Sequence, residues 1–284
     1  MSTRTLLVVF AHPDDESFGT GGTLAHYAAQ GVRVALVCAT RGEAGEISDP
    51  ALATPETLGT VREAELRCAA QALGIADLIF LGYRDSGMAG SPDNEDPRAF
   101  VNADADEVVR RLVGIIRRLR PQVVITFEPN GGYGHPDHIA IHRHTVAAFR
   151  AAADPARYPD QGPPWQPARL FYTAIPRSVF VRMRERMVAL GLDTHDLDRI
   201  LEWRRGWSDE QVHVVLDVAG VVEAKWTAIH CHRTQIGPGH LFRRLPEAEM
   251  KRLMSREYYE LAWPAPTPGQ RLSDLFAGIE AVNE

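Results

Sequence analysis

Long apolar runs constrain the fold of this chain more than any other feature. Residues 5–11 read TLLVVFA and residues 32–40 read VRVALVCAT, without the apolar–polar alternation of a half-exposed strand. Such runs are typical of parallel strands buried on both faces. We expect further strands near 77–82, 121–129, 169–175 and 213–218, and helices near 17–30, 60–74, 104–120, 135–153, 177–190 and 220–232. This alternation predicts an α/β fold with a Rossmann-like, mostly parallel sheet flanked by helices.

Two polar clusters follow apolar strands of this pattern. HPDDE (12–16) comes directly after the first run, and GGYGHPDH (131–138) comes after the run 121–129. A single His-Pro-Asp is usually a turn or a helix start, and a turn needs only one Asp or Pro. Ligands of open α/β sheets bind outside the carboxyl ends of the strands, so the fold can bring both clusters to one crevice. The repeated motif with extra His and acid therefore indicates a functional site.

The residue types in the two clusters are those of a catalytic metal site. His12, the carboxylate three residues later and His138 give two imidazoles and one carboxylate, with a position left for water. Zinc in such a site lowers the pKa of its bound water to about 7 and polarises the carbonyl under attack. Because Asp14 and Asp15 are adjacent, one can bind the metal while the other remains free as a general base.

Other residues of these two segments each have two possible roles. His135 could stabilise an oxyanion or protonate a leaving amine, and Asp137 could hold it as an imidazolium. Tyr133 is either a loop anchor or a hydroxyl aimed at the substrate. Glu16 either favours the start of the next helix or supports the metal ligands. Two histidines are expected on the exposed side of their helix: His142 and His144.

Composition narrows the class of protein and its surroundings. The net charge is −6 with scattered arginines, which argues against nucleic acid as a partner. The three cysteines, Cys38, Cys68 and Cys231, form no CxxC pair, so we expect neither a cysteine zinc site nor a disulfide framework. The first apolar run is too short for a secretion signal, and none approaches the roughly 20 residues of a membrane span. We expect a cytoplasmic enzyme that is not bound to a membrane.

The chain length of 284 residues allows one large domain or two coupled lobes. A segment rich in Pro, Asp and Gly (154–168) separates the two halves. We interpret 1–284 as a single domain. Residues 1–153 form the Rossmann-like core with both metal motifs, and 154–284 form a smaller C-terminal α/β extension that completes the fold and closes the site.

The paired motifs AHPDDE and GHPDH resemble those of the PIG-L/LmbE-like zinc-dependent N-acetylglucosamine deacetylases. The resemblance covers most of the chain. The segments GYRDSGMAG (82–90), LRPQVVITFEPNGGYGHPDH (119–138) and KWTAIHCHRTQ (225–235) are similar to the branch of mycothiol- and bacillithiol-pathway deacetylases and mycothiol conjugate amidases. The resemblance implies one Zn²⁺ per chain, which Fe²⁺ can replace, and a small N-acetylglucosaminyl conjugate as substrate. The protein could be a homo-oligomer.

The resemblance also implies a role for individual residues. The metal ligands would be His12, Asp15 and His138. The catalytic group would comprise Asp14 as general base, His135 oriented by Asp137 to stabilise the tetrahedral intermediate, and Tyr133 near the substrate carbonyl. The substrate-binding residues would be Arg84, Asp85, His232 and Gln235.

These expectations predict an N-deacetylase, with two functional alternatives. The first is an amidase that cleaves larger acyl-glucosamine thiol S-conjugates. Conjugate amidases resemble one another in having a lysine shortly after HPDDES, whereas Phe18, Gly19 and Thr20 follow here, which argues against this alternative. The second is a non-catalytic sugar- or metal-binding homologue, against which the presence of both Asp14 and His135 speaks. A two-metal phosphoesterase would need a second set of carboxylate ligands, which we do not find near either motif.

Overall fold

The computed structural model describes residues 4–202, 206–237 and 239–279, and a seven-stranded sheet runs through this part of the chain. Its strand order is β3-β2-β1-β4-β5-β7-β6. The strands are β1 (Thr5–Phe10), β2 (Arg33–Cys38), β3 (Asp77–Phe80), β4 (Val123–Thr126), β5 (Arg169–Thr173), β6 (Val214–Asp217) and β7 (Arg256–Trp263). Strands β1 to β5 pair in parallel, whereas β7 is antiparallel to both β5 and β6. The predicted mostly parallel α/β fold is confirmed.

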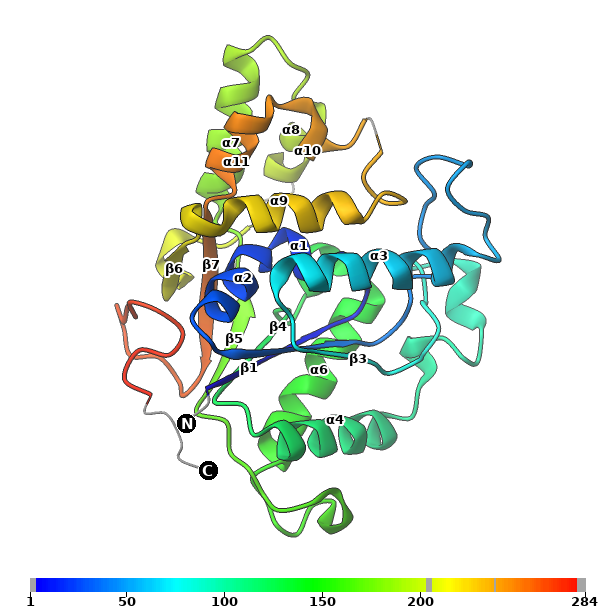
Figure 1. Ribbon diagram of the computed structural model, residues 1–284, viewed down its shortest axis with the longest axis vertical. Coiled ribbons are helices and arrows are strands. Elements are labelled where there is room, and N and C mark those ends of the chain that lie inside the picture. The colour runs from blue at the N-terminus through cyan, green and yellow to red at the C-terminus, as the bar shows by residue number, and fades with distance from the viewer. Residues whose placement is uncertain (1–3, 203–205, 238, 280–284) are drawn as a thin grey trace.

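Helices cover both faces of the sheet, which explains the continuous apolar runs (Figure 1). On one face lie α2 (Gly21–Ala29), α3 (Leu58–Leu73) and α9 (Val222–Cys231), and on the other lie α4 (Ala105–Leu119) and α6 (Pro136–Ala151). Leu6 and Val8 of β1 belong to the core under the first layer. Leu7 and Val9 belong to the core under the second. Successive side chains of a strand point to opposite faces, so the five β1 residues after Thr5, Leu6 to Phe10, are all apolar.

The register of the sheet brings the two polar clusters together. Strand β1 lies between β2 and β4, with Val8 opposite Ile125 of β4. Both strands run in the same direction, so the chain leaves them at the same edge. The cluster 12–16 therefore begins next to the loop that precedes 131–138.

A third group of helices lies at one end of the molecule, above α9 in Figure 1. It comprises α7 (Arg177–Ala189), α8 (His195–Glu202), α10 (Leu241–Arg244) and α11 (Glu247–Leu253). These helices share a small core with α9, in which Met187, Leu197, Ile229 and Met250 are buried.

Several elements differ from the sequence prediction. The expected helix 17–30 is two helices, α1 (Asp15–Phe18) and α2, so helical structure starts within the HPDDE cluster itself. Strand β7 and helices α8, α10 and α11 were not predicted. The pattern of β7 alternates between buried and partly exposed residues, which is typical of an antiparallel strand rather than of the buried parallel ones.

A buried ion pair joins β7 to the first helical layer. Lys225 of α9 lies 2.6 Å from Glu257 of β7, and both side chains are buried. Glu257 also accepts hydrogen bonds from the backbone N–H groups of Gly22 and Thr23, in the first turn of α2. A carboxylate at a helix N-terminus is favoured by the unpaired amides and by the helix dipole. This pair fixes the antiparallel part of the sheet to the parallel part.

The structure corrects the expectation about disulfides. Cys68 of α3 and Cys231 at the end of α9 form a disulfide across 163 residues of sequence, and Cys38 is a buried free thiol. The spacing of cysteines along the chain does not reveal that α3 packs against α9, so the pattern alone could not predict the bond. Among the described helices, none has the length and apolar character needed to span a membrane.

Candidate metal centre and catalytic site

Three potential metal ligands converge where β1 and β4 end. His12 Nδ1 lies 3.1 Å from His138 Nε2, which in turn lies 3.3 Å from Asp15 Oδ1. The separation of His12 Nδ1 and Asp15 Oδ2 is 3.7 Å. In a tetrahedral zinc site with bonds of about 2.0–2.1 Å, the ligand atoms lie about 3.3–3.4 Å apart. The two imidazole nitrogens and the two oxygens of the Asp15 carboxylate therefore lie at distances close to those between the ligands of one small cation.

The hydrogen-bond partners of the two imidazoles support the same conclusion. His138 Nδ1 lies 3.1 Å from the carbonyl oxygen of Gly131, which accepts a proton on that nitrogen, and Nε2 faces His12. His12 Nε2 lies 3.1 Å from a carboxylate oxygen of Asp137. Although burial opposes the rise, Asp85, Asp137 and Asp15 raise the pKa of His12 well above its usual value, so without an ion this ring is the cation of the group. A bound metal requires neutral imidazoles, in which the proton of His12 stays on Nε2 and the two facing nitrogens and the Asp15 carboxylate are all acceptors. A cation is the partner that such a group of acceptors fits.

Local backbone geometry positions Asp15. Its Oδ2 accepts hydrogen bonds from the backbone N–H groups of Ala11 (3.2 Å) and His12 (2.8 Å). Burial alone would raise the pKa of Asp15, but the imidazoles of His138 and His12 hold this pKa well below its usual range. The carboxylate is therefore ionised, as a metal ligand must be.

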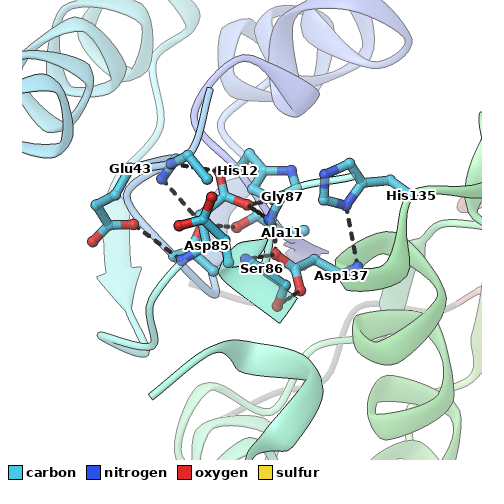
Figure 2. Close-up of polar contacts among 12 residues, drawn as sticks. Ala11, His12, Glu43, Asp85, Ser86, Gly87, His135 and Asp137 are labelled. Atoms are coloured by element: carbon cyan, nitrogen blue, oxygen red, sulfur yellow. Dashed lines mark hydrogen bonds and ion pairs between the residues drawn. The ribbon is translucent and has the colours of Figure 1, made fainter. Parts of the chain in front are cut away.

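Two further carboxylates hold the far side of the His12 ring, as Figure 2 shows. Besides Asp137, Asp85 Oδ1 lies 3.4 Å from His12 Nε2. Asp137 also accepts hydrogen bonds from the backbone N–H (3.0 Å) and hydroxyl (2.5 Å) of Ser86, and Asp85 accepts one from the N–H of Gly87 (2.9 Å). Carboxylates on the second nitrogen of a ligand histidine fix its orientation and raise its basicity. Both carboxylates were named from the sequence, but their contact with His12 was not predicted.

The structure thereby changes two predicted contacts. The carboxylate of Asp137 was expected to orient His135, but it faces His12 and Ser86 (Figure 2). Asp85 was expected to bind the sugar of the substrate, but its carboxylate is buried and contacts His12. The motif spacing could not reveal either contact, because both depend on how the loop after β3 crosses the end of β1.

His135 precedes α6, and its ring packs edge-on against that of His12 with 4.5 Å between ring centres. Its Nδ1 accepts a hydrogen bond from the backbone N–H of Asp137 (3.1 Å), so Nε2 bears the proton of the neutral ring. Burial and the neighbouring His12 and His138 lower the pKa of His135 to about 4. A neutral His135 ring offers an N–H donor, and the imidazolium expected from the sequence stays a prediction.

Asp14 lies between Pro13 and Asp15 in an unusual backbone conformation, with φ at 111°. Its N–H donates to Glu16 Oε2 (3.0 Å), and its Oδ2 accepts a bond from Arg62 Nη2 (3.2 Å). Arg62 is buried and also donates to the carbonyl of Pro13 (2.6 Å). Burial raises the pKa of Asp14 to about 6, although Arg62 opposes this rise. Arg62 was not identified from the sequence, where it is one arginine of an amphipathic helix.

Glu16 connects the turn formed by residues 12–16 to the C-terminal part of the chain. Its Oε1 lies 2.7 Å from Nε2 of His232, which is fully buried. His232 was predicted to bind substrate, but the structure places it behind the turn and away from solvent. Gln235 was also predicted to bind substrate. Its side-chain amide donates a hydrogen bond to the backbone carbonyl of Glu46 (2.9 Å).

Tyr133 lies on the short helix α5 (Gly131–Gly134), is 46% exposed and lines a cavity that also has His138 in its wall. Its ring centre is 5.1 Å from that of His138. The buried carboxylate of Glu128 holds the loop, since it accepts backbone hydrogen bonds from Asn130 and Gly132, both at 2.6 Å.

The histidines of α6 beyond the metal ligand do not lie together on its exposed side. His142 is buried and its Nδ1 lies 2.8 Å from the carbonyl oxygen of Phe127, while His144 is half-buried. The expectation of an exposed position for His142 is therefore wrong. The reason is that this side of α6 packs on the loop after β4.

The structure has an apolar cavity next to the candidate metal ligands and a polar groove between two loops. An apolar cavity of about 310 Å³ has Asp15 and His138 in its wall and is otherwise lined largely by apolar and aromatic side chains, among them Phe18, Phe180 and Trp207. A polar groove is lined by side chains of the loops that follow β2 and β3, including Arg41, Glu43, Arg84 and Arg98. Arg84, predicted to bind sugar, forms ion pairs with Asp93 (2.6 Å) and Asp96 (3.3 Å) there.

This α/β fold and this site define a class of hydrolases that have a His–His–carboxylate group at the carboxyl edge of the sheet. The chain belongs to the PIG-L family, whose profile, described as GlcNAc-PI de-N-acetylase, matches residues 7–149. The resemblance stated from the paired motifs is confirmed.

Full-length relatives agree with this assignment. The chain is 43% identical over 292 residues to a 1D-myo-inositol 2-acetamido-2-deoxy-alpha-D-glucopyranoside deacetylase of Streptomyces scabiei, covering 98% of this chain and 90% of the relative. It is also 43% identical over 289 residues to the protein of the same name from Geodermatophilus obscurus, covering 98% of each. Among solved structures, the N,N'-diacetylchitobiose deacetylase from Pyrococcus horikoshii shares the fold, with a TM-score of 0.64 and 20% identity over 94% of this chain and 84% of that one.

Proposed function

We propose that this protein hydrolyses the acetamide of an N-acetylglucosaminyl conjugate, and that inositol is the first aglycone to test. The deacetylases of Streptomyces scabiei and Geodermatophilus obscurus carry an inositol conjugate of this kind in their names. The observation that carries the proposal is the position of Asp14, a carboxylate with a pKa near 6 beside three convergent metal ligands. A general base is most effective when its pKa lies near the working pH.

The ligands we assign to the ion are His12, Asp15 and His138, and zinc fits their number and chemistry. When bound, zinc polarises the amide carbonyl and makes water more acidic. Asp14 takes the proton from the attacking water. The neutral His135 ring donates its Nε2–H to the oxygen that becomes negative, and Tyr133 is exposed for the same task. Asp14 returns the proton to nitrogen as the C–N bond breaks, which gives acetate and the free amine.

The test is acetate release from N-acetylglucosaminyl-inositol and N-acetylglucosaminyl-malate by protein loaded with Zn²⁺ or, without oxygen, with Fe²⁺. Asp14→Ala is the matched variant, because it removes the base and leaves all three ligands. We expect turnover of one substrate by the wild type, and a loss of about 10²–10⁴-fold in the variant with its metal content unchanged. A metal-loaded wild type that releases acetate from neither substrate would contradict the proposal.

The apolar cavity favours a second candidate, hydrolysis of amides with a larger acyl group. Its volume of about 310 Å³ is within the usual range of ligand pockets, roughly 300–1,000 Å³, and exceeds what an acetyl methyl group fills. Comparing kcat/KM for acetyl and bulkier acyl-glucosaminyl conjugates distinguishes the two. Phe180→Trp, which narrows the cavity, would then slow the bulkier substrate more than the acetyl one.

The proposal treats residues 1–284 as one domain. Strands β5, β6 and β7 of the C-terminal part continue the sheet of the first part, and His232 reaches back to Glu16. Both features make the metal motifs dependent on the extension.

A further inference from the structure

The Cys68–Cys231 disulfide joins the two helices that hold the catalytic turn, defined here as residues 12–16. Helix α3 carries both Cys68 and Arg62, and α9 ends at Cys231, directly before His232. Arg62 holds the turn from one side through Pro13 and Asp14. His232 holds it from the other side through Glu16.

The catalytic turn needs this support because Asp14 has a left-handed backbone conformation. Such a conformation is unfavourable for a residue with a side chain. The N–H of Asp14 donates a hydrogen bond to one carboxylate oxygen of Glu16, and the other oxygen of Glu16 contacts His232. The Asp14 carboxylate accepts a hydrogen bond from Arg62. A shift of α3 against the end of α9 would therefore change the direction of the Asp14 carboxylate.

Two hydrogen bonds also link α3 to the segment that follows α9. Glu65 of α3 accepts bonds from the N–H (2.8 Å) and hydroxyl (2.6 Å) of Thr234. These two hydrogen bonds do not depend on the S–S bond, so reduction removes only the covalent part of the link. Cys68 is exposed while Cys231 is buried, so a reductant has access to one sulfur of the bond.

We propose that the Cys68–Cys231 disulfide is a redox-sensitive positioning element for the catalytic turn, and that its reduction lowers turnover. This inference rests on the proposed deacetylase function. The reductant is a low-molecular-weight thiol. Its thiolate attacks Cys68 Sγ, the S–S bond breaks, and Cys231 leaves as a thiolate. A second thiol then resolves the mixed disulfide, so two thiols are oxidised to one disulfide while both cysteines gain a proton.

The experiment compares acetate release by oxidised and reduced zinc-loaded protein. A phosphine reductant such as tris(2-carboxyethyl)phosphine is preferred, because dithiols compete for zinc. Alkylation after denaturation reports the redox state, since the oxidised chain offers only Cys38 and the reduced chain offers all three cysteines. We expect reduction to lower kcat by about fivefold or more, with KM and bound zinc unchanged, because small displacements of catalytic groups are costly. Reoxidation restores the original rate.

Variants separate positioning from general stability. Cys68→Ser, at the exposed position, should have the rate of the reduced wild type and no response to the reductant. Cys38→Ser keeps the disulfide and should retain the wild-type ratio of oxidised to reduced kcat. An unchanged kcat in fully reduced protein overturns the inference, as does a lower melting temperature without a change in kcat. Failure of the proposed function differs from both, because then neither redox form releases acetate.

Discussion

The substitution Asp137→Asn tests how the second carboxylates support the metal centre. It keeps the shape of a fully buried side chain and removes its charge. The hydroxyl of Ser86 can rotate to suit the new amide, so the packing is preserved. His12 Nε2 loses its anionic acceptor at 3.1 Å, and Nδ1 becomes a weaker metal ligand. We expect the dissociation constant for Zn²⁺ to rise.

The expected magnitude follows from that single contact. Loss of a partner on the second nitrogen of a ligand histidine typically costs about 10–100-fold in metal affinity. This corresponds to about 1.4–2.7 kcal/mol of binding free energy. Asp85→Asn is the matched control. Its oxygen lies farther from the same nitrogen, at 3.4 Å, so its effect on affinity should be the smaller one.

Competition with a chromophoric chelator measures both affinities, and acetate release at saturating zinc measures what remains of catalysis. A zinc affinity within about twofold of wild type, together with a lower kcat at saturating zinc, would refute this reasoning. That result would instead support the contact expected from the sequence, in which Asp137 orients His135.

Three further outcomes are expected. Arg62→Met leaves the buried carbonyls of Pro13 and Gly42 without this donor, so the free energy of unfolding in urea should fall by about 2 kcal/mol or more, and kcat should fall as well. Lys225→Met leaves the Glu257 carboxylate buried without its cation, and urea unfolding should show a loss of about 3–5 kcal/mol. Dialysis against a chelator should abolish acetate release while circular dichroism stays unchanged, and added Zn²⁺ should restore the rate.

Each of these has a contrary result. A change below about 0.5 kcal/mol for Lys225→Met would mean that the backbone amides alone satisfy Glu257. Full activity of Arg62→Met would show that Asp14 needs no guanidinium to keep its position. Acetate release that persists in metal-free protein would remove the assigned role of His12 and His138.

The parallel part of the fold was predictable because its signal is local. A strand covered on both faces must be apolar at each position, so β1 and β2 are visible as runs of letters. Strand β7 and the small helices α8, α10 and α11 were missed. Strand β7 has weaker alternating patterns, and its place between β5 and β6 depends on pairing with segments far away in sequence.

For the site too, the features that are local in sequence were predictable and the contacts between distant residues were not. The sequence by itself determined which residue types gather at the ends of β1 and β4, because two His-Pro-Asp motifs after buried strands have few structural uses. The tertiary structure alone decided the contacts made through space. It placed Asp137 and Asp85 on His12, buried His232 behind Glu16 and joined Cys68 to Cys231. Side chains that are distant in sequence meet only once the helices have packed, and no local pattern records the direction in which each one then points.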